Sequence, residues 1–148
     1  MESVLLIGVQ ASGKSTFYKE KFFNTHVRIS NDLLKTKNRK KLLLEYCSNT
    51  QMSFVVDNTN ATKDIRKKYI ESAKEAKIPV IGYYFKTNLS LSIERNKKRV
   101  KKEIVPIAGI LGTHKKLEIP TVEEGFSELY YVESNDNEFI IKEWQDEV

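Results

Sequence analysis

The sequence has a single cysteine, Cys47, and only three prolines in 148 residues, and it contains no long apolar run. One cysteine excludes a disulfide within the chain and is typical of a reducing compartment. No apolar segment approaches the roughly 20 residues of a membrane-spanning helix, so we expect no membrane partner. The apolar stretch 4–7 lacks a basic leader, which favours a strand over a signal peptide. We therefore expect a cytoplasmic protein.

Internal repeats, low-complexity tracts and Gly/Ser-rich linkers are also absent from the sequence. Its 40% hydrophobic and 30% charged residues are typical of a globular protein. The length suffices for one compact domain but not for two of ordinary size. We therefore expect a single domain over residues 1–148.

Acidic residues are scarce in most of the chain. Residues 1–117 hold 24 Lys and Arg against 10 Asp and Glu, whereas residues 118–148 hold 1 against 10. The net charge of +5 thus divides into +14 and −9. A basic body of this size indicates an anionic partner larger than a nucleotide, although a lysine-rich surface is often only well solvated.

Short apolar runs alternate with helical patterns, and the runs lie at residues 4–7, 27–29, 54–56 and 80–85. They lack polar alternation, which is typical of strands buried under helices on both faces. This order predicts an α/β fold, a three-layer sandwich around a central parallel sheet. Residues 129–132 are expected to add a last core strand, and residues 139–141 complete an edge hairpin at about 129–143, across the polar turn 134–137.

Residues 8–16, GVQASGKST, place the spacing G-x(4)-G-K-S between a predicted strand and a predicted helix. Glycines let backbone N–H groups turn toward a β-phosphate, Lys14 reaches the β- and γ-phosphates, and Ser15 offers a hydroxyl to Mg²⁺. We therefore expect ATP or another NTP as ligand, with Mg²⁺. The expected nucleotide contacts are Gly8, Ala11, Ser12, Gly13, Lys14, Ser15 and Thr16.

Two aspartates follow predicted strands, at the sheet edge where a parallel α/β fold binds its ligand. Asp57 ends the third strand, where a carboxylate suits Mg²⁺, although the sequence DNTN is also good turn chemistry. Asp32 follows the second strand, where a carboxylate can orient and deprotonate an acceptor hydroxyl. The alternative for Asp32 is a helix cap. Lys35 would share its helical face and hold an acceptor phosphate.

A third feature is the stretch RNKKRVKK, in which six of eight residues are cationic. Helical spacing places Arg95 and Arg99 on one face and Val100 and Ile104 on another, so we expect a helical lid at about 94–105. Phosphoryl transfer is often assisted by an arginine that neutralises the transferring group. A charge run on a helix is also commonly a solvated face.

Beyond these motifs, the string VVDNTNATKDIRKKYIESAKEAKIPVIGYYF, followed by an Arg/Asn-rich helix and HKKLEIPTVEEGFSELYYVE, resembles the kinase domain of polynucleotide 5′-kinases over nearly the whole chain. The glycine loop alone is common to many NTPases. The combination of DNTN with the pattern F/LE-x-PT-x-EGF, at residues 117–126, is more specific.

The resemblance implies transfer of the γ-phosphate of ATP to a polynucleotide 5′-hydroxyl end, in RNA or DNA repair, and we expect a single-stranded acceptor. It implies Asp32 as general base and Lys14 and Arg99 as further catalytic residues. Arg99, or alternatively Arg95, is the implied lid arginine that contacts the donor phosphates. Lys35 stands where the family usually has an arginine, so the charge is kept and the bidentate fork is lost. The implied acceptor contacts are Asp32, Lys35, Asp57, Asn58 and Arg66.

Two other functions remain open from the sequence. The same scaffold serves small-metabolite kinases of the gluconate or shikimate type, which need a compact acceptor pocket. A nucleotide-binding module without transferase activity is the other alternative, and the intact set of Lys14, Ser15, Asp32 and Asp57 argues against it.

Overall fold

The computed structural model describes residues 1–135 and 138–145. Its strands are β1 (Ser3–Ile7), β2 (Val27–Ile29), β3 (Phe54–Asp57), β4 (Val80–Phe85), β5 (Glu128–Asn135) and β6 (Glu138–Glu143). Its helices are α1 (Lys14–Lys21), α2 (Asn31–Leu34), α3 (Lys37–Thr50), α4 (Lys63–Glu75), α5 (Leu89–Lys97) and α6 (Ile107–Lys116), with the 3-10 turns η1 (Lys101–Glu103) and η2 (Val122–Glu124). Two residues of the predicted turn, Asp136 and Asn137, lie outside the described residues.

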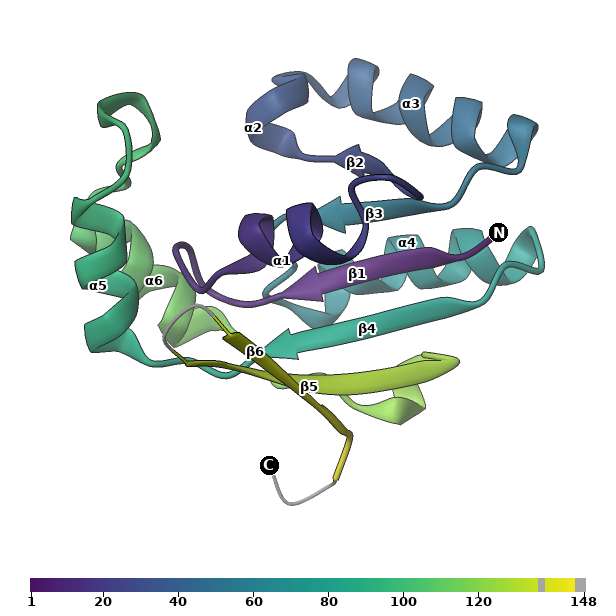
Figure 1. Ribbon diagram of the computed structural model, residues 1–148. Helices are drawn as coiled ribbons and strands as arrows, with labels where there is room; N and C mark the ends of the chain where they lie inside the picture. Colours follow the sequence, from purple (N-terminus) through teal and green to yellow (C-terminus); the bar gives the residue numbers. More distant parts are fainter. Residues whose placement is uncertain (136–137, 146–148) are drawn as a thin grey trace.

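The strands form one sheet in the order β2-β3-β1-β4-β5-β6 (Figure 1). The first five strands of this order are parallel, and β1 lies between β3 and β4. The predicted α/β fold with a central parallel sheet is therefore confirmed. The sheet is mixed at one edge, because β6 pairs antiparallel with β5 and places Ile141 opposite Val132.

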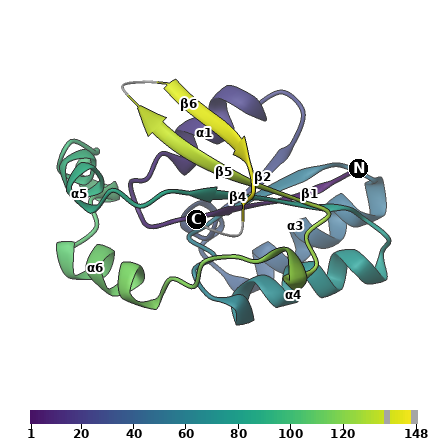
Figure 2. The ribbon, with the colours of Figure 1, turned by 90° about the horizontal axis from the view of Figure 1, so that it is seen from below.

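Helices cover both faces of the sheet (Figure 2). Val4 and Leu6 point to the face covered by α1, where they pack in one cluster with Phe17. Leu5 and Ile7 point to the face covered by α3 and α4. Because both faces are covered, every residue of β1 is buried, which explains the continuous apolar run at 4–7.

The ring of Phe17 anchors α1 to the sheet and to the C-terminal hairpin. It lies edge-to-face with Phe85 of β4 and Phe139 of β6, at centroid distances of 5.2 and 5.3 Å. Such pairs add stabilisation beyond the apolar area that they bury. The start of α1, and with it the glycine loop, is thereby fixed at the carboxyl ends of the central strands.

The helical face predicted for Arg95 and Arg99 is wrong, because α5 ends at Lys97. The side chain of buried Asn96 exchanges two hydrogen bonds with the backbone of Val105, at 2.5 and 2.9 Å. These bonds hold a non-helical loop that contains η1. Arg99 therefore lies beyond the helix on that loop, and α5 and α6 stand at the carboxyl edge of the sheet (Figure 1).

In the part of the chain that the structure describes, none of the helices has both the length and the apolar character that crossing a membrane requires.

Candidate active site

The glycine loop connects β1 to α1 and needs two residues in the left-handed region, Ala11 at φ 57° and Gly13 at φ 101°. Gly13 is the N-cap residue of α1, and a Cβ there would lie 3.1 Å from Cε1 of Phe139. Glycine at this position thus suits both the backbone conformation and the close packing. The first N–H groups of α1 face the cleft, where they favour an anion.

Lys14 is only 8% exposed, and the loop wraps around its ammonium group. The Nζ donates to the carbonyl oxygens of Gly8 and Val9, at 3.0 and 2.6 Å, and contacts the Ser12 hydroxyl at 3.5 Å. Burial lowers the pKa of Lys14 to about 8, an effect that Asp57 opposes. Gly8 and Ser12 are therefore positioned to hold this lysine, and the other predicted loop residues line the cleft.

Ser15 and Asp57 lie together at the bottom of the cleft, and the Ser15 hydroxyl donates to Asp57 Oδ2 at 2.9 Å. Asp57 is 6% exposed, so these are two oxygen groups at a protected point. Mg²⁺ commonly takes one or two protein oxygens and completes its shell with phosphates and water. The pair fits this requirement. No larger cluster of His, Cys, Asp and Glu suited to a metal occurs among residues 1–135 and 138–145.

Arg28 is a site residue that the motif analysis missed. Its Nε donates to Asp57 Oδ2 at 2.8 Å, and its Nη2 donates to the Ser15 hydroxyl at 3.3 Å. The signal in the sequence was a charged residue at the centre of the apolar run VRI. Because Arg28 contacts both oxygen groups, a cation bound there has to displace its guanidinium group.

The turn after β3 is held by Asn60, another residue that was missed. Its Nδ2 donates to the carbonyl oxygens of Leu6 and Val56, at 2.7 and 3.2 Å, and so joins the ends of β1 and β3. The carbonyl oxygen of Thr59 accepts the Gly8 N–H at 3.0 Å. The motif DNTN thus locks the glycine loop to the strand that carries Asp57.

Asp32 lies on α2, is exposed and lines the cleft. The cap of this helix is Ser30, whose hydroxyl accepts the Leu33 N–H at 3.4 Å, so the capping role does not require Asp32. Asn58 fixes the position of α2, because its Oδ1 accepts the Asn31 N–H at 2.8 Å.

Arg95 of α5 and Arg99 of the loop after it line the same cleft. Arg95 Nη2 donates to the Ser134 hydroxyl at 2.7 Å, which ties α5 to β5. Arg99 is near enough to Lys14 to lower its pKa further. Both arginines therefore line the cleft that Asp32 also lines, and Arg95 lies beside Gly13 at the start of α1.

Two predicted acceptor contacts lie elsewhere. Lys35 is the C-cap residue that follows α2, with φ 71°, and it is not among the residues that line the cleft. Arg66 is fully buried, and its guanidinium group pairs with Glu124 at 2.9 and 3.2 Å and donates to the carbonyl oxygens of Asn60 and Ala61. The prediction of Arg66 as an acceptor contact is therefore corrected: it joins α4 to η2.

The cleft has a volume of about 500 Å³ and opens at the carboxyl edge of the sheet. Its residues come from the glycine loop and the start of α1, from β2 and α2, from the end of β3, and from α5 and the loop after it. They are Gln10, Ala11, Gly13, Lys14, Ser15, Thr16, Arg28, Ser30, Asn31, Asp32, Asp57, Asn58, Thr59, Arg95, Arg99 and Val105.

A glycine loop at the end of a central parallel strand, followed by a helix that begins with Lys14 and Ser15, defines a P-loop domain of the kinase type. The chain belongs to the family AAA_33, described as an AAA domain, whose model matches residues 34–118, more than half of the chain. This match includes Asp57 and both cleft arginines of α5 and its loop, and it begins after Asp32.

A curated relative is the bifunctional polynucleotide phosphatase/kinase of Schizosaccharomyces pombe, which is 31% identical over 130 residues. The match covers 85% of this chain and 32% of the relative, so the chain spans about a third of that protein's length.

Solved structures share the fold at lower identity. A gluconokinase from Sinorhizobium meliloti 1021 has a TM-score of 0.61 and 19% identity, over 89% of this chain and 82% of the gluconokinase. Kti12 from Chaetomium thermophilum, in complex with ADP-AlF3, has a TM-score of 0.67 and 16% identity, over 92% of this chain and 91% of Kti12.

Proposed function

We propose that the chain transfers the γ-phosphate of ATP to the 5′-hydroxyl end of a polynucleotide. The observation that carries the proposal is that Asp32 lines the same cleft as Lys14 and Ser15. One cleft thus holds groups suited to a triphosphate and a carboxylate suited to an acceptor hydroxyl. The named kinase activity of the S. pombe relative supports a polynucleotide as acceptor.

The glycine loop and Lys14 form the donor side of the proposed site. The N–H groups at the start of α1 bind the phosphates, and the Lys14 ammonium group contacts their oxygens from within the loop. Ser15 and Asp57 are the residues that would hold Mg²⁺, which when bound neutralises charge on the β- and γ-phosphates.

Asp32 forms the acceptor side. Its carboxylate accepts the proton of the 5′-hydroxyl as the hydroxyl oxygen bonds to the γ-phosphorus. The bond between that phosphorus and the β–γ bridging oxygen breaks, and ADP leaves. Arg95 and Arg99, which line the same cleft, neutralise the charge on the transferring group.

The exposure of Asp32 and the charge of the chain favour a long acceptor over a small one. Asp32 is exposed, so the end of an extended strand can reach it. Residues 1–117 carry 24 cationic against 10 acidic side chains, which favours attraction of a polyanion.

The test is incubation with γ-labelled ATP, Mg²⁺ and a panel of acceptors: 5′-hydroxyl RNA, 5′-hydroxyl DNA, gluconate and shikimate. The matched controls are the same oligonucleotides with a 5′-phosphate. We expect label in the 5′-hydroxyl oligonucleotides and none in the controls. Label only in the small acceptors would indicate a metabolite kinase, and label in none would indicate a nucleotide-binding module; either result would overturn the proposal.

A further inference from the structure

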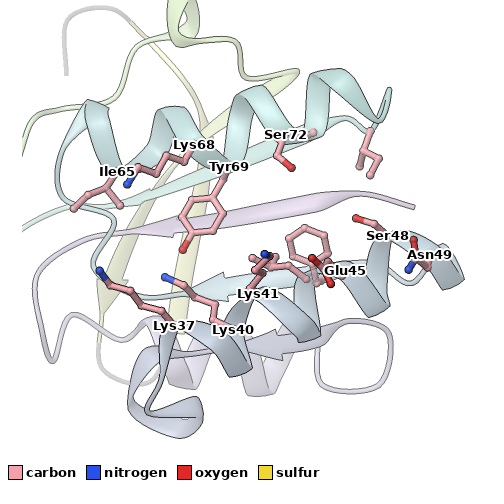
Figure 3. A pocket seen from close by; sticks show the side chains of 14 residues that line it. Lys37, Lys40, Lys41, Glu45, Ser48, Asn49, Ile65, Lys68, Tyr69 and Ser72 are labelled. Carbon is pink, nitrogen blue, oxygen red and sulfur yellow. The ribbon is translucent and has the colours of Figure 1, made fainter.

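A groove of about 470 Å³ lies between α3 and α4, on the face of the sheet opposite α1 (Figure 3). None of its residues belongs to the proposed active site. The lining residues are Lys37, Lys40, Lys41, Leu44, Glu45, Ser48, Asn49, Phe54, Ile65, Lys68, Tyr69, Ser72, Ala73 and Ile78. The volume is in the range of sites that bind small molecules or single nucleotides.

The groove has an apolar floor and a basic rim. Residues such as Leu44, Phe54 and Ile78 form the floor. Among the described residues that line it, four are lysines and one, Glu45, is acidic. The groove therefore attracts an anion that also has apolar surface to bury.

The lysines gather at one end of the groove. Lys37, Lys40 and Lys41 lie in the first turns of α3, and Lys68 lies in the first half of α4. Figure 3 shows Lys37, Lys40 and Lys68 around the same end as Ile65, away from Asn49. Both helices begin at the carboxyl edge of the sheet, where the cleft opens, so the basic end of the groove and Asp32 share one edge.

Tyr69 supplies the aromatic group that the basic run of α3 lacks. Its ring is half-buried and reaches from α4 toward α3, with Lys40 Nζ at 5.8 Å from the ring centroid (Figure 3). An aromatic ring beside lysines is the arrangement by which proteins hold single-stranded nucleic acid, because the base stacks and its phosphates meet the cations. An acidic peptide would use the cations but gains little from the ring.

We propose that this groove binds the acceptor strand on the 3′ side of its 5′-hydroxyl end, with a base on Tyr69 and backbone phosphates at Lys37, Lys40, Lys41 and Lys68. The inference rests on the proposed function and adds a second contact region to it. The strand runs from Asp32 past α2 into the groove, and longer acceptors bind more tightly than short ones.

The experiment compares a 5′-hydroxyl dinucleotide with a 5′-hydroxyl 12-mer as acceptors. The first variant is the double substitution Lys40→Glu and Lys41→Glu, and its matched control is Lys19→Glu and Lys21→Glu on α1, on the opposite face of the sheet. We expect the groove variant to raise KM for the 12-mer about tenfold or more at low salt, while KM for the dinucleotide and for ATP stay unchanged. The slope of log affinity against log salt, which is negative, should become less steep by about 1 to 1.5.

A second pair of variants separates stacking from charge. Tyr69→Ala should raise KM for the 12-mer about tenfold, and Tyr69→Phe, which keeps the ring, should not. Thermal unfolding of each variant checks that the fold is retained. An equal effect of the α1 control, equal KM values for both acceptors in the wild type, or no effect of Tyr69→Ala in a folded protein would overturn the inference.

Equilibrium binding distinguishes failure of the groove from failure of the proposed function. A fluorescent 12-mer with a 5′-phosphate, titrated without ATP, reports the groove independently of transfer. We expect it to bind the wild type and the α1 control alike, and the groove variant about tenfold more weakly. Displacement of this 12-mer by a polyglutamate peptide of equal charge, at equal concentration, would overturn the inference in favour of an acidic-peptide surface.

Discussion

Arg28 Nε lies 2.8 Å from Oδ2 of Asp57, so the proposed magnesium carboxylate is already paired with a cation of the chain. The pair is asymmetric, because the Asp57 side chain is 2% exposed and that of Arg28 is 33% exposed. The Arg28 side chain is therefore partly open to solvent, whereas the Asp57 side chain is enclosed. Arg28 neutralises the buried carboxylate, and a divalent cation bound at the proposed site would take over that role.

This relationship predicts the response of Arg28→Ala to Mg²⁺. Without the metal, the variant should lose about 1–3 kcal/mol of unfolding free energy, because the buried Asp57 carboxylate loses its cation. The loss is smaller than for a fully buried pair, because Arg28 is partly exposed and solvent screens the interaction. MgCl₂ without nucleotide should raise the melting temperature of the variant more than that of the wild type. Thermal unfolding in MgCl₂ and in EDTA checks this, with Arg39→Ala, which removes an exposed arginine of α3, as control. Equal shifts in both proteins would contradict the metal site.

Asp32→Asn is expected to slow transfer strongly and to leave nucleotide affinity nearly intact. The amide cannot accept the hydroxyl proton, which should lower the rate about 10²- to 10⁴-fold. Among the described residues, Asp32 makes no hydrogen bond to the glycine loop; its charge raises the pKa of Lys14, but less than Asp57 does, so nucleotide affinity should change little. Turnover and a nucleotide Kd measured on the same preparation test this, with Asp64→Asn, an acid in the first turn of α4, as the matched control. Parallel losses of affinity and rate would refute the role of a base.

Lys14 predicts an unusual pH dependence of stability. Its folded pKa is about 8 and its ordinary pKa is 10.5, so between these values the unfolded chain holds a proton that the folded chain has released. Unfolding free energy from this group therefore rises with pH across that window, by about 3 kcal/mol in all. The difference between the wild type and Lys14→Met, measured by denaturant unfolding, should grow from pH 8 to 10.5 in favour of the wild type. A constant difference would show that Lys14 is not desolvated.

The same lysine predicts the pH dependence of nucleotide affinity. Only the ammonium form contacts phosphate oxygens favourably, so ATP binding without metal should weaken above pH 8. Above pH 8 the association constant for ATP should decrease with a slope that approaches about tenfold per pH unit. The decrease should stop near the pKa of Lys14 in the ATP complex. Titration of ATP at several pH values checks this. Lys86→Met, which removes an exposed lysine outside the cleft, should leave the profile unchanged.

The parts of the site that were predicted are those whose partners are close in sequence. The glycine loop holds Lys14 through Gly8, Val9 and Ser12, so a local spacing was sufficient to find it. The strands were predicted because burial on both faces leaves continuous apolar runs, as in β1.

The parts that were missed depend on contacts between distant residues. Arg66 pairs with Glu124, 58 positions away, and only the fold brings them together. The end of α5 depends on the two hydrogen bonds between the Asn96 side chain and the Val105 backbone, because these bonds hold the following residues in a loop and not in a longer helix. Tyr69 joins the lysines of α3 only because α3 and α4 pack side by side on one face of the sheet.

The Arg66–Glu124 pair gives a prediction that distinguishes a role in stability from a role in acceptor binding. Arg66→Met should lower the unfolding free energy by about 3–5 kcal/mol, because Glu124, with a side chain 11% exposed, loses its cation. Replacing both residues, with Arg66→Met and Glu124→Gln, should restore part of the loss, since no charge is then left unpaired. Lys67→Ala removes a neighbouring exposed pair with Glu71, at 3.7 Å, and should cost no more than about 0.5 kcal/mol. ATP and acceptor KM of the folded fraction should stay unchanged in all three variants. A rise in acceptor KM but not in ATP KM with Arg66→Met would instead indicate that Arg66 binds the acceptor.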